Sequence, residues 1–201
     1  MEPYESRVNG EIMQYVVLGM PADGPTLTLD WHAFSYAGKF EMSSTGKALL
    51  CDAHRIVAAA AFNEDRETSS KAWIRYLTVR SDEQGNGYGP RLATNVTETL
   101  LEDGYERVAI AVNNPRAYQA LYKAGFHFTG RETGIAELVL EHPGQREPES
   151  YRAGLRRFVE RDRPVQNKQQ LISWLEDGTP PETVNGIPMA PSDEASDDGP
   201  C

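Results

Sequence analysis

Residues 79–91 read VRSDEQGNGYGPR, and they join an apolar run to the start of a predicted helix through three glycines. Glycine adopts backbone conformations that other residues avoid, so such a junction can turn sharply. The first N–H groups of the following helix have no partner within it, and the helix dipole adds partial positive charge there. The stretch therefore predicts either a phosphate-binding loop or a plain strand-to-helix turn.

Two common phosphate-binding patterns do not match this chain. The spacing G-x-G-x-G of Gly85, Gly87 and Gly89 differs from the dinucleotide fingerprint G-x-G-x-x-G. Gly46-Lys47 is not part of a P-loop, because Ala48 follows the lysine and Glu41 stands where the first glycine should be. A phosphate loop here has to be of another kind.

Alternating strands and helices are predicted on both sides of the glycine stretch. One helix is predicted from the recurrence of apolar residues every four positions, and it ends at Gly104. A second begins after Asn114-Pro115 and ends at Gly125. Short apolar runs predict strands at 47–52, 55–62, 73–79, 108–112, 126–129 and 135–140.

The two ends of the chain have different compositions. Residues 11–19 and 26–31 look extended, whereas apolar spacing predicts helices around 151–159 and 171–175. From Gly178 onward the chain is rich in proline and acidic residues and has no basic residue. We expect this tail to be disordered at least in part.

Composition limits the function. The chain has 201 residues, 39% of them hydrophobic, which suits one folded core. Lys and Arg number 20 against 30 Asp and Glu, so the formal net charge is −10 and a nucleic-acid partner is not expected. No apolar stretch is long enough to span a membrane, and the first twenty residues do not resemble a secretory signal.

Two further features bear on the cellular location. Cys51 and Cys201 are the two cysteines, too few for a disulfide framework, which favours a reducing compartment such as the cytoplasm. The acid excess is spread along the chain, and arginine outnumbers lysine among the bases. This pattern suits a salt-rich cytoplasm, although an ordinary mildly acidic protein would look similar.

Two motifs in this order resemble a known family. Gln84-x-x-Gly87-x-Gly89 after a strand resembles the Q/R-x-x-G-x-G/A pyrophosphate loop of the GNAT superfamily of acetyl-CoA-dependent N-acetyltransferases. The segment from Asn114 to Phe126 resembles the next motif of that family. The resemblance covers about residues 46–141, and the whole chain is more loosely similar to uncharacterised members from halophilic archaea.

The resemblance implies a fold, an activity and a division of the chain. The fold would be α/β (α+β), a mixed twisted sheet flanked by helices with splayed central parallel strands. The activity would be transfer of an acetyl group from acetyl-CoA to a primary amine. Residues 1–142 would form the catalytic domain, with an atypical acceptor side at 1–45, followed by a helical extension at 143–177 and the acidic tail at 178–201.

The same resemblance assigns the cofactor-binding residues. Backbone N–H groups of the glycine loop, with the side chain of Gln84 beside them, would hold the pyrophosphate. Arg91 could reach a phosphate, although a solvated surface arginine is an equal alternative. One strand edge and the second helix would line the pantetheine arm. The full set is Leu77, Thr78, Val79, Gln84, Gly85, Asn86, Gly87, Tyr88, Gly89, Arg91, Asn114, Ala117 and Tyr118.

Catalysis by direct attack needs a proton acceptor and a proton donor. An alkylammonium with a pKa of about 10.4 must lose a proton, and the leaving thiolate gains one. The family tyrosine would fall at Leu121, so we expect Tyr122, then Tyr118, to act as the acid, with packing as the alternative role. The family glutamate would fall at Trp73, which leaves Glu64 and Asp65 as candidate bases or as solvated turn residues.

Other functions remain open at this stage. The chain could be a non-catalytic acyl-CoA-binding or regulatory module, or residues 143–201 could form a partner-docking arm. The amine could belong to a small molecule or to a protein, and a homodimer is left open. We expect no metal site, because Cys51, Asp52 and His54 have no second group of ligands at suitable spacing. We also expect no covalent acyl-enzyme intermediate.

Overall fold

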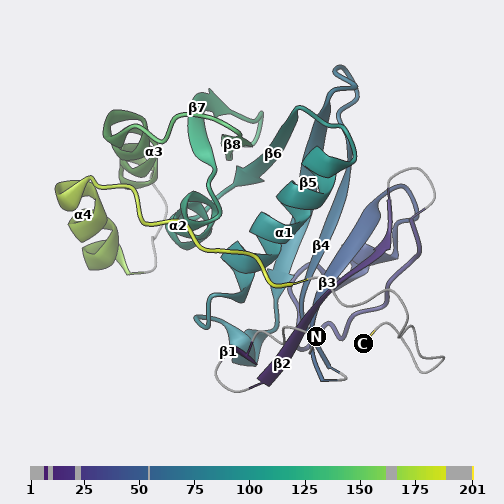
Figure 1. Ribbon diagram of the computed structural model, residues 1–201. Coiled ribbons are helices and arrows are strands. Elements are labelled where there is room, and N and C mark those ends of the chain that lie inside the picture. The colour runs from purple at the N-terminus through teal and green to yellow at the C-terminus, as the bar shows by residue number, and fades with distance from the viewer. Residues whose placement is uncertain (1–6, 9–10, 21–23, 54, 162–166, 189–200) are drawn as a thin grey trace, which may run out of the picture.

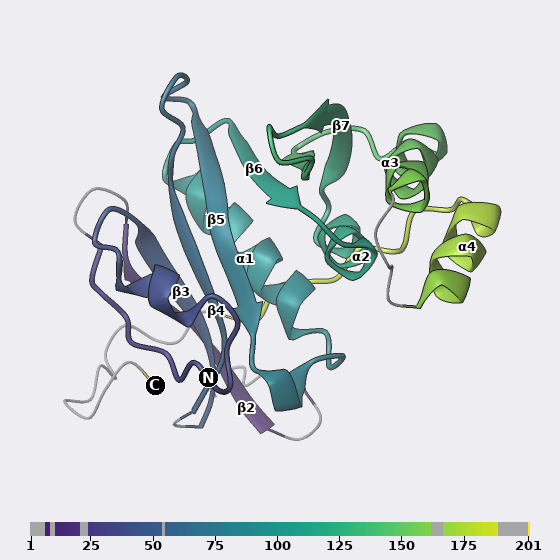
Figure 2. The same cartoon turned by 180° about the vertical axis from the view of Figure 1, so that it is seen from behind.

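A twisted mixed sheet forms the centre of the protein (Figure 1, Figure 2). The computed structural model describes residues 7–8, 11–20, 24–53, 55–161, 167–188 and 201. The strand order is β1-β2-β3-β4-β5-β6-β8-β7, and β5 and β6 pair in parallel. The strands are β1 Arg7–Val8, β2 Glu11–Gly19, β3 Gly46–Asp52, β4 Arg55–Glu64, β5 Lys71–Val79, β6 Arg107–Val112, β7 His127–Glu132 and β8 Leu138–His142.

Four α-helices and two 3₁₀ turns accompany the sheet. They are η1 Ala37–Glu41, η2 Ser81–Glu83, α1 Tyr88–Glu102, α2 Pro115–Lys123, α3 Pro148–Glu160 and α4 Lys168–Asp177. The predicted mixed sheet flanked by helices is confirmed. The extended segment expected at 26–31 is not a strand, since residues 24–30 pair with no neighbouring strand.

The main core lies between the sheet and the helices α1 and α2. Leu92, Val96 and Leu100 form the apolar face of α1, and all three are fully buried against the sheet. Their spacing of four residues places them on one side of a helix. Because α1 is the first α-helix after β5, its packing fixes the position of the glycine loop between the two elements.

A second, smaller core covers the opposite face of β2, β3 and β4. Leu27, Leu29, Phe34 and Phe40 from the segment before β3 pack there, and Tyr76 of β5 borders them. The apolar residues at 26–31 alternate as in a strand, but this segment has no regular secondary structure and packs its apolar side chains on this face of the sheet. This explains why their pattern predicts the wrong element.

The C-terminal part is more closely attached than its composition suggests. Tyr151, Leu155 and Phe158 of α3 are buried in the main core. Residues 178–188, expected within a disordered tail, run along α1 and α2: the backbone N–H of Val184 donates to the carbonyl of Lys123 at 2.8 Å. Ile187 is also buried, and residues 189–200 lie outside the described part.

The two cysteines are paired, contrary to the expectation from their number. Cys51 on β3 forms a disulfide with Cys201, and their Cα atoms are 5.6 Å apart. The bond joins positions 150 residues apart. Two cysteines are too few for a framework but enough for one long-range link, so the inference of a reducing compartment from their number does not hold. Among the described residues, no helix combines the length and apolar character needed to cross a membrane.

Candidate functional site

The parallel strands β5 and β6 separate halfway along their length. Their pairing runs from Lys71 opposite Arg107 to Ile74 opposite Ile110 and then stops, although β5 continues to Val79. At the same point the register between β4 and β5 shifts, so Arg75 is an extra residue in a β-bulge. A bulge bends its strand and redirects the neighbouring side chains. The result is a V between the strands, whose apex lies at Ile74 (Figure 2).

The glycine loop lies at the open end of this V. Gly85 and Gly87 adopt positive φ angles of 97° and 83°, and Gly87 is the N-cap residue of α1. A Cβ atom built on either glycine would have no heavy atom within 4 Å, apart from its own chain neighbours. The loop therefore has open space in front of it, next to helix N–H groups that can receive an anion.

Charges beside the loop are balanced within the protein. Arg55 pairs with Glu83 and lies 3.6 Å from Asp82, and Arg80 lies 2.9 Å from the same aspartate. The Glu83 carboxylate also accepts a hydrogen bond from Asn86 at 2.9 Å. Because these acids are neutralised, they do not oppose an incoming phosphate group as free carboxylates would.

Two of the predicted phosphate ligands are placed differently from each other. The side chain of Gln84 is exposed beside the loop. The guanidinium of Arg91 is turned toward the C-terminal segment, where it donates to the carbonyl of Asn185 at 3.4 Å. To bind a phosphate, Arg91 would have to give up this weak hydrogen bond and turn its side chain toward the glycine loop.

The other side of the V is formed by the start of α2. The side chain of Asn114 caps this helix and accepts a hydrogen bond from the backbone N–H of Ala117 at 2.9 Å. Asn114 is exposed to solvent, and Ala117 is partly buried. Both residues therefore offer solvent-accessible surface beside the V.

Tyr118 and Tyr122 lie inside the core rather than at the surface of the V. Both are fully buried. The Tyr118 hydroxyl donates to the carbonyl of Tyr151 at 3.0 Å, and the Tyr122 hydroxyl accepts from the N–H of Phe128 at 3.0 Å. Burial, followed by the neighbouring Tyr122, raises the pKa of Tyr118 far above its usual value. This geometry favours packing over proton transfer for both phenols.

The acidic candidates lie at the far end of β4. Glu64 is exposed there, and Asp65 follows it in the turn to β5. Burial raises the pKa of Asp65, but hydrogen bonds from the Glu67 backbone and the Trp73 indole, together with Lys71 at 3.4 Å, outweigh it and bring the pKa to about 2. A carboxylate held so firmly in its charged form is a weak base near neutral pH.

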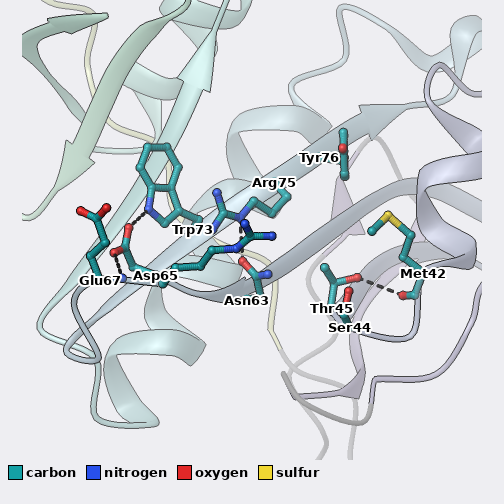
Figure 3. A pocket seen from close by; sticks show the side chains of 10 residues that line it. Met42, Ser44, Thr45, Asn63, Asp65, Glu67, Trp73, Arg75 and Tyr76 are labelled. Atoms are coloured by element: carbon teal, nitrogen blue, oxygen red, sulfur yellow. Dashed lines mark hydrogen bonds between the residues drawn. The ribbon is translucent and has the colours of Figure 1, made fainter. Parts of the chain in front are cut away.

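A pocket of about 490 Å³ opens on the sheet face away from α1, and we call it the Arg75 pocket (Figure 3). Trp73 and Tyr76 reach this face because the neighbouring Ile74 and Leu77 pack on the α1 side. The pocket lies beside the apex of the V, since Arg75 follows the last paired residue of β5. Its lining is Met42, Ser44, Thr45, Asn63, Asp65, Arg66, Glu67, Trp73, Arg75 and Tyr76.

The Arg75 pocket was missed in the sequence because a β-bulge leaves no mark in it. Without the bulge, strict alternation would place Arg75 on the same face as Trp73 and send Tyr76 to the other face. The bulge keeps Trp73 and Tyr76 on one face and brings Arg75 between them. The only hint of this pocket in the sequence is the pair of arginines Arg66 and Arg75, and arginines are common on any protein surface.

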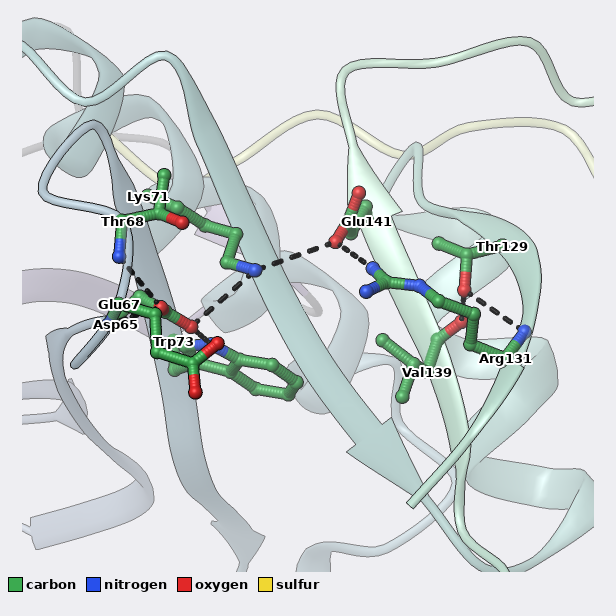
Figure 4. A network of polar contacts seen from close by, with 9 residues as sticks. All are labelled: Asp65, Glu67, Thr68, Lys71, Trp73, Thr129, Arg131, Val139 and Glu141. Carbon is green, nitrogen blue, oxygen red and sulfur yellow. Dashed lines mark hydrogen bonds and ion pairs between the residues drawn. The ribbon is translucent and has the colours of Figure 1, made fainter.

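A second pocket of about 460 Å³ lies on the same sheet face, beyond Lys71. A chain of charges crosses from one pocket to the other: Lys71 reaches Asp65 and Glu141, and Glu141 also pairs with Arg131 (Figure 4). Glu141 is buried, and its charge is satisfied by these two cations. The chain ties β5 to β8 and β7, so its main effect is to hold the two sides of the sheet together.

Two of the three residues considered as metal ligands have partners within the protein. Cys51 is in the disulfide, Asp52 lies 3.9 Å from Arg55, and His54 is outside the described residues.

Comparison with known proteins identifies the fold. The model of the acetyltransferase (GNAT) family matches residues 22–126, about half of the chain. An acetyltransferase from Bacillus subtilis, solved in complex with CoA, is similar in structure with a TM-score of 0.52 and 12% identity, covering 66% of this chain and 99% of the other. No curated protein matches in sequence.

Two other solved structures are less similar. The PaiA N-acetyltransferase from Thermoplasma acidophilum, in complex with coenzyme A, has a TM-score of 0.41 and 14% identity over 47% of this chain and 58% of its own. An acetyltransferase from Thermus thermophilus has a TM-score of 0.45 and 22% identity over 54% and 70%.

Proposed function

Since the chain belongs to the acetyltransferase (GNAT) family, we propose that it transfers an acetyl group from acetyl-CoA to a primary amine. Acetyl-CoA is the usual co-substrate of this family. One observation carries the proposal: β5 and β6 part at Ile74, and the open end of the V meets a glycine loop with free space in front of it.

The residues present fit such a ligand. Helix N–H groups behind Gly87 and Gly89 would hold the pyrophosphate, with Gln84 beside them. The β5 edge at Leu77, Thr78 and Val79 offers backbone groups to an extended arm, because no β6 residue pairs with it there. When bound, acetyl-CoA supplies a thioester that an amine can attack directly.

Residues of the chain then have to orient the amine and remove its proton. We propose that the amine approaches the apex of the V through the Arg75 pocket, on the sheet face away from α1. Asp65 is too weak a base for this task, and Glu64 does not line the pocket. We propose that the amine loses its proton to water, with the exposed Glu64 as a further acceptor, and that CoA leaves as a thiolate that takes a proton from water.

A second candidate function rests on a specific observation. Tyr118 and Tyr122 are buried with their hydroxyls bonded to the backbone, and Trp73 stands at the position of the family glutamate. A pocket without acid and base would bind acyl-CoA and not turn it over. The chain would then be a binding or regulatory module.

The proposal is tested first by titration calorimetry with acetyl-CoA. We compare the wild type with Gly87→Trp and the matched control Gly87→Ala. Both variants place a side chain at positive φ, which costs about 1–2 kcal/mol, but only tryptophan fills the space in front of the loop. We expect micromolar binding by the wild type and Gly87→Ala, and a loss of at least about 30-fold in Gly87→Trp.

The outcomes separate the candidates. A folded wild type that does not bind acetyl-CoA would refute both functions. Binding followed by release of free CoA with any member of a broad amine panel supports the enzyme. Binding without release on the whole panel supports the module.

We also propose that the protein works in a salt-rich environment. The support is its formal net charge of −10 and the small share of lysine among its 20 basic residues. Dispersed carboxylates keep a protein hydrated where their mutual repulsion is screened by salt.

A further inference from the structure

The Arg75 pocket collects positive charge that carboxylates of the protein do not neutralise. Arg75 and Arg66 both line it, and Arg66 lies close enough to lower the pKa of Arg75. Among the described residues, no carboxylate lies within ion-pair distance of Arg75, whose Nε donates to the amide oxygen of Asn63 at 2.6 Å. This bond uses only Nε, so the terminal NH₂ groups of the guanidinium are left for another partner.

The acids of the pocket do not remove this excess. Asp65 is already paired with Lys71 at 3.4 Å and bonded to the Trp73 indole. Glu67 is the one remaining acid in the lining, and it is exposed. Two guanidiniums therefore face one exposed carboxylate.

A third basic side chain, Lys47, lies beneath the residues that line the pocket. Lys47 is fully buried, and its ammonium donates to the carbonyls of Met42 and Thr45, each at 2.7 Å, and to the Thr45 hydroxyl at 2.8 Å. Met42 and Thr45 line the pocket. Within the described residues Lys47 has no carboxylate partner, and burial lowers its pKa. In its charged form it adds to the positive field at the pocket.

The surroundings of Arg75 also disfavour its charge. Partial burial lowers its pKa, and the positive charge of Arg66 lowers it further, against the opposing effect of Asp65. Arginine stays charged at any working pH. A bound anion would stabilise this arrangement, and a planar fork of N–H donors suits a carboxylate.

The guanidinium is held in one place. Its carbon lies 5.1 Å from the centre of the Trp73 ring, and Asn63 fixes its Nε from β4 (Figure 3). Because Arg75 is the bulged residue next to Ile74, the guanidinium stands beside the apex of the V. An anion bound there would lie a short distance from a reacting amine.

From this geometry we infer that the acceptor is a small molecule carrying both an amine and a carboxylate, with the carboxylate bound by Arg75 and Arg66. The inference rests on the proposed acetyl transfer and specifies its substrate class. The pocket volume of about 490 Å³ suits a free amino acid or a molecule of similar size. Arg75 is then a specificity-determining residue.

The test uses matched acceptors on the full chain. Free amino acids are screened with acetyl-CoA for CoA release, and the best is compared with its amide, its decarboxylated amine and its aminophosphonate. We expect the amide and the decarboxylated amine to lose at least about 30-fold in kcat/KM, as expected when a charged partner is removed. An aminophosphonate that exceeds the carboxylate would assign a phosphate-type anion and overturn the choice of carboxylate.

Two variants and a control complete the test. Arg75→Met should lower kcat/KM for the amino acid at least about 30-fold and for the decarboxylated amine by a much smaller factor, with Arg75→Lys intermediate. Arg156→Met, at an exposed arginine of α3, should change neither. An equal loss for both acceptors in Arg75→Met would overturn the inference.

Binding gives a readout that does not depend on turnover. Calorimetry of the same amino acids in the presence of CoA should show binding by the wild type and none by Arg75→Met. Acetyl-CoA should bind both proteins equally. If acetyl-CoA binds and no amino acid does, the inference fails while the cofactor site stands. If acetyl-CoA itself does not bind, the proposed function fails.

Discussion

Tyr118 and Tyr122 stand one helical turn apart on α2, and their ring centres are 4.8 Å from each other. Tyr151 and Phe158 of α3 surround them, at 5.9 Å and 5.7 Å from the Tyr118 ring. Each hydroxyl has one backbone partner, so each phenol joins two elements. The rings contribute apolar contact, and the hydroxyls satisfy groups that would otherwise be buried without a partner.

Tyr122→Phe separates packing from catalysis. Removing the hydroxyl leaves the buried N–H of Phe128 without its acceptor, which should lower the free energy of unfolding by about 1–3 kcal/mol. We expect kcat to change less than about threefold, because the phenol does not reach the V. Urea denaturation and steady-state kinetics measure the two quantities on the same sample.

Tyr118→Phe is the companion variant, since its hydroxyl bonds a carbonyl instead of an N–H. A drop in kcat of about 100-fold or more in either variant, with the alkaline limb of the pH profile lost, would show a general acid. It would also show that the tyrosine cluster opens during turnover.

Individual residues were predictable where the backbone itself demands them. Gly85 and Gly87 need positive φ, and Asn114 caps a helix, so their residue types reveal their roles. The tyrosines illustrate the opposite case. Helical spacing places Tyr118 and Tyr122 on one face of α2, but the sequence does not say that α3 covers that face.

At the level of elements, α3 packs directly on α2 through a glycine. A Cβ atom added to Gly154 would lie 2.2 Å from the Tyr118 hydroxyl oxygen, closer than any real contact. The missing side chain lets the two helices approach. Helix α3 is thus part of the folded core, which weighs against a detachable docking arm that begins at residue 143.

Gly154→Ala should therefore destabilise the protein although alanine favours helices. We expect a loss of about 1–3 kcal/mol from overpacking, measured by denaturant unfolding. Gly134→Ala is the control, because a Cβ there has no heavy atom within 4 Å and φ is not positive. A stability gain in Gly154→Ala would mean that α3 can move away from α2.

Elements with strong local patterns were predicted within a few residues. Strand 11–19 coincides with β2, and the helix after Asn114 is α2. The apolar segment at 26–31 was not predictable, because its role depends on which sheet face lacks a helix. The bulge at Arg75 also depends on two strands pairing, which no local pattern records.

For the whole molecule, the formal charge of −10 is the dominant electrostatic feature. Mutual repulsion of like charges destabilises a compact chain, and salt screens it. Raising KCl from about 0.1 M to about 2 M should increase the free energy of unfolding by about 1–3 kcal/mol, roughly 3–10 °C in Tm for this size. Thermal denaturation followed by circular dichroism measures the shift.

The same titration at another pH is its control. Near the isoelectric point of about 4.9 the net charge is close to zero, so the salt effect should largely disappear. An equal rise in Tm at both pH values would point to a general salt effect on the protein surface. The salt-rich setting would then lose its support.

The disulfide shows the limit of sequence reasoning at this scale. Cys51 and Cys201 are 150 residues apart, and nothing near either residue indicates its partner. The net charge follows from composition, whereas this link depends on how the fold brings the two residues together. Knowledge of the whole fold is needed before such a pairing can be proposed.

The parting of β5 and β6 has a final consequence for handling the protein. Residues 75–79 of β5 present backbone N–H and C=O groups on the side where β6 has left the ladder. Such an open edge can recruit strands from other chains and start aggregation. A bound CoA would cover that edge with its pantetheine arm, so the cofactor would also reduce self-association of the protein. Preparations stripped of CoA should be the ones that precipitate.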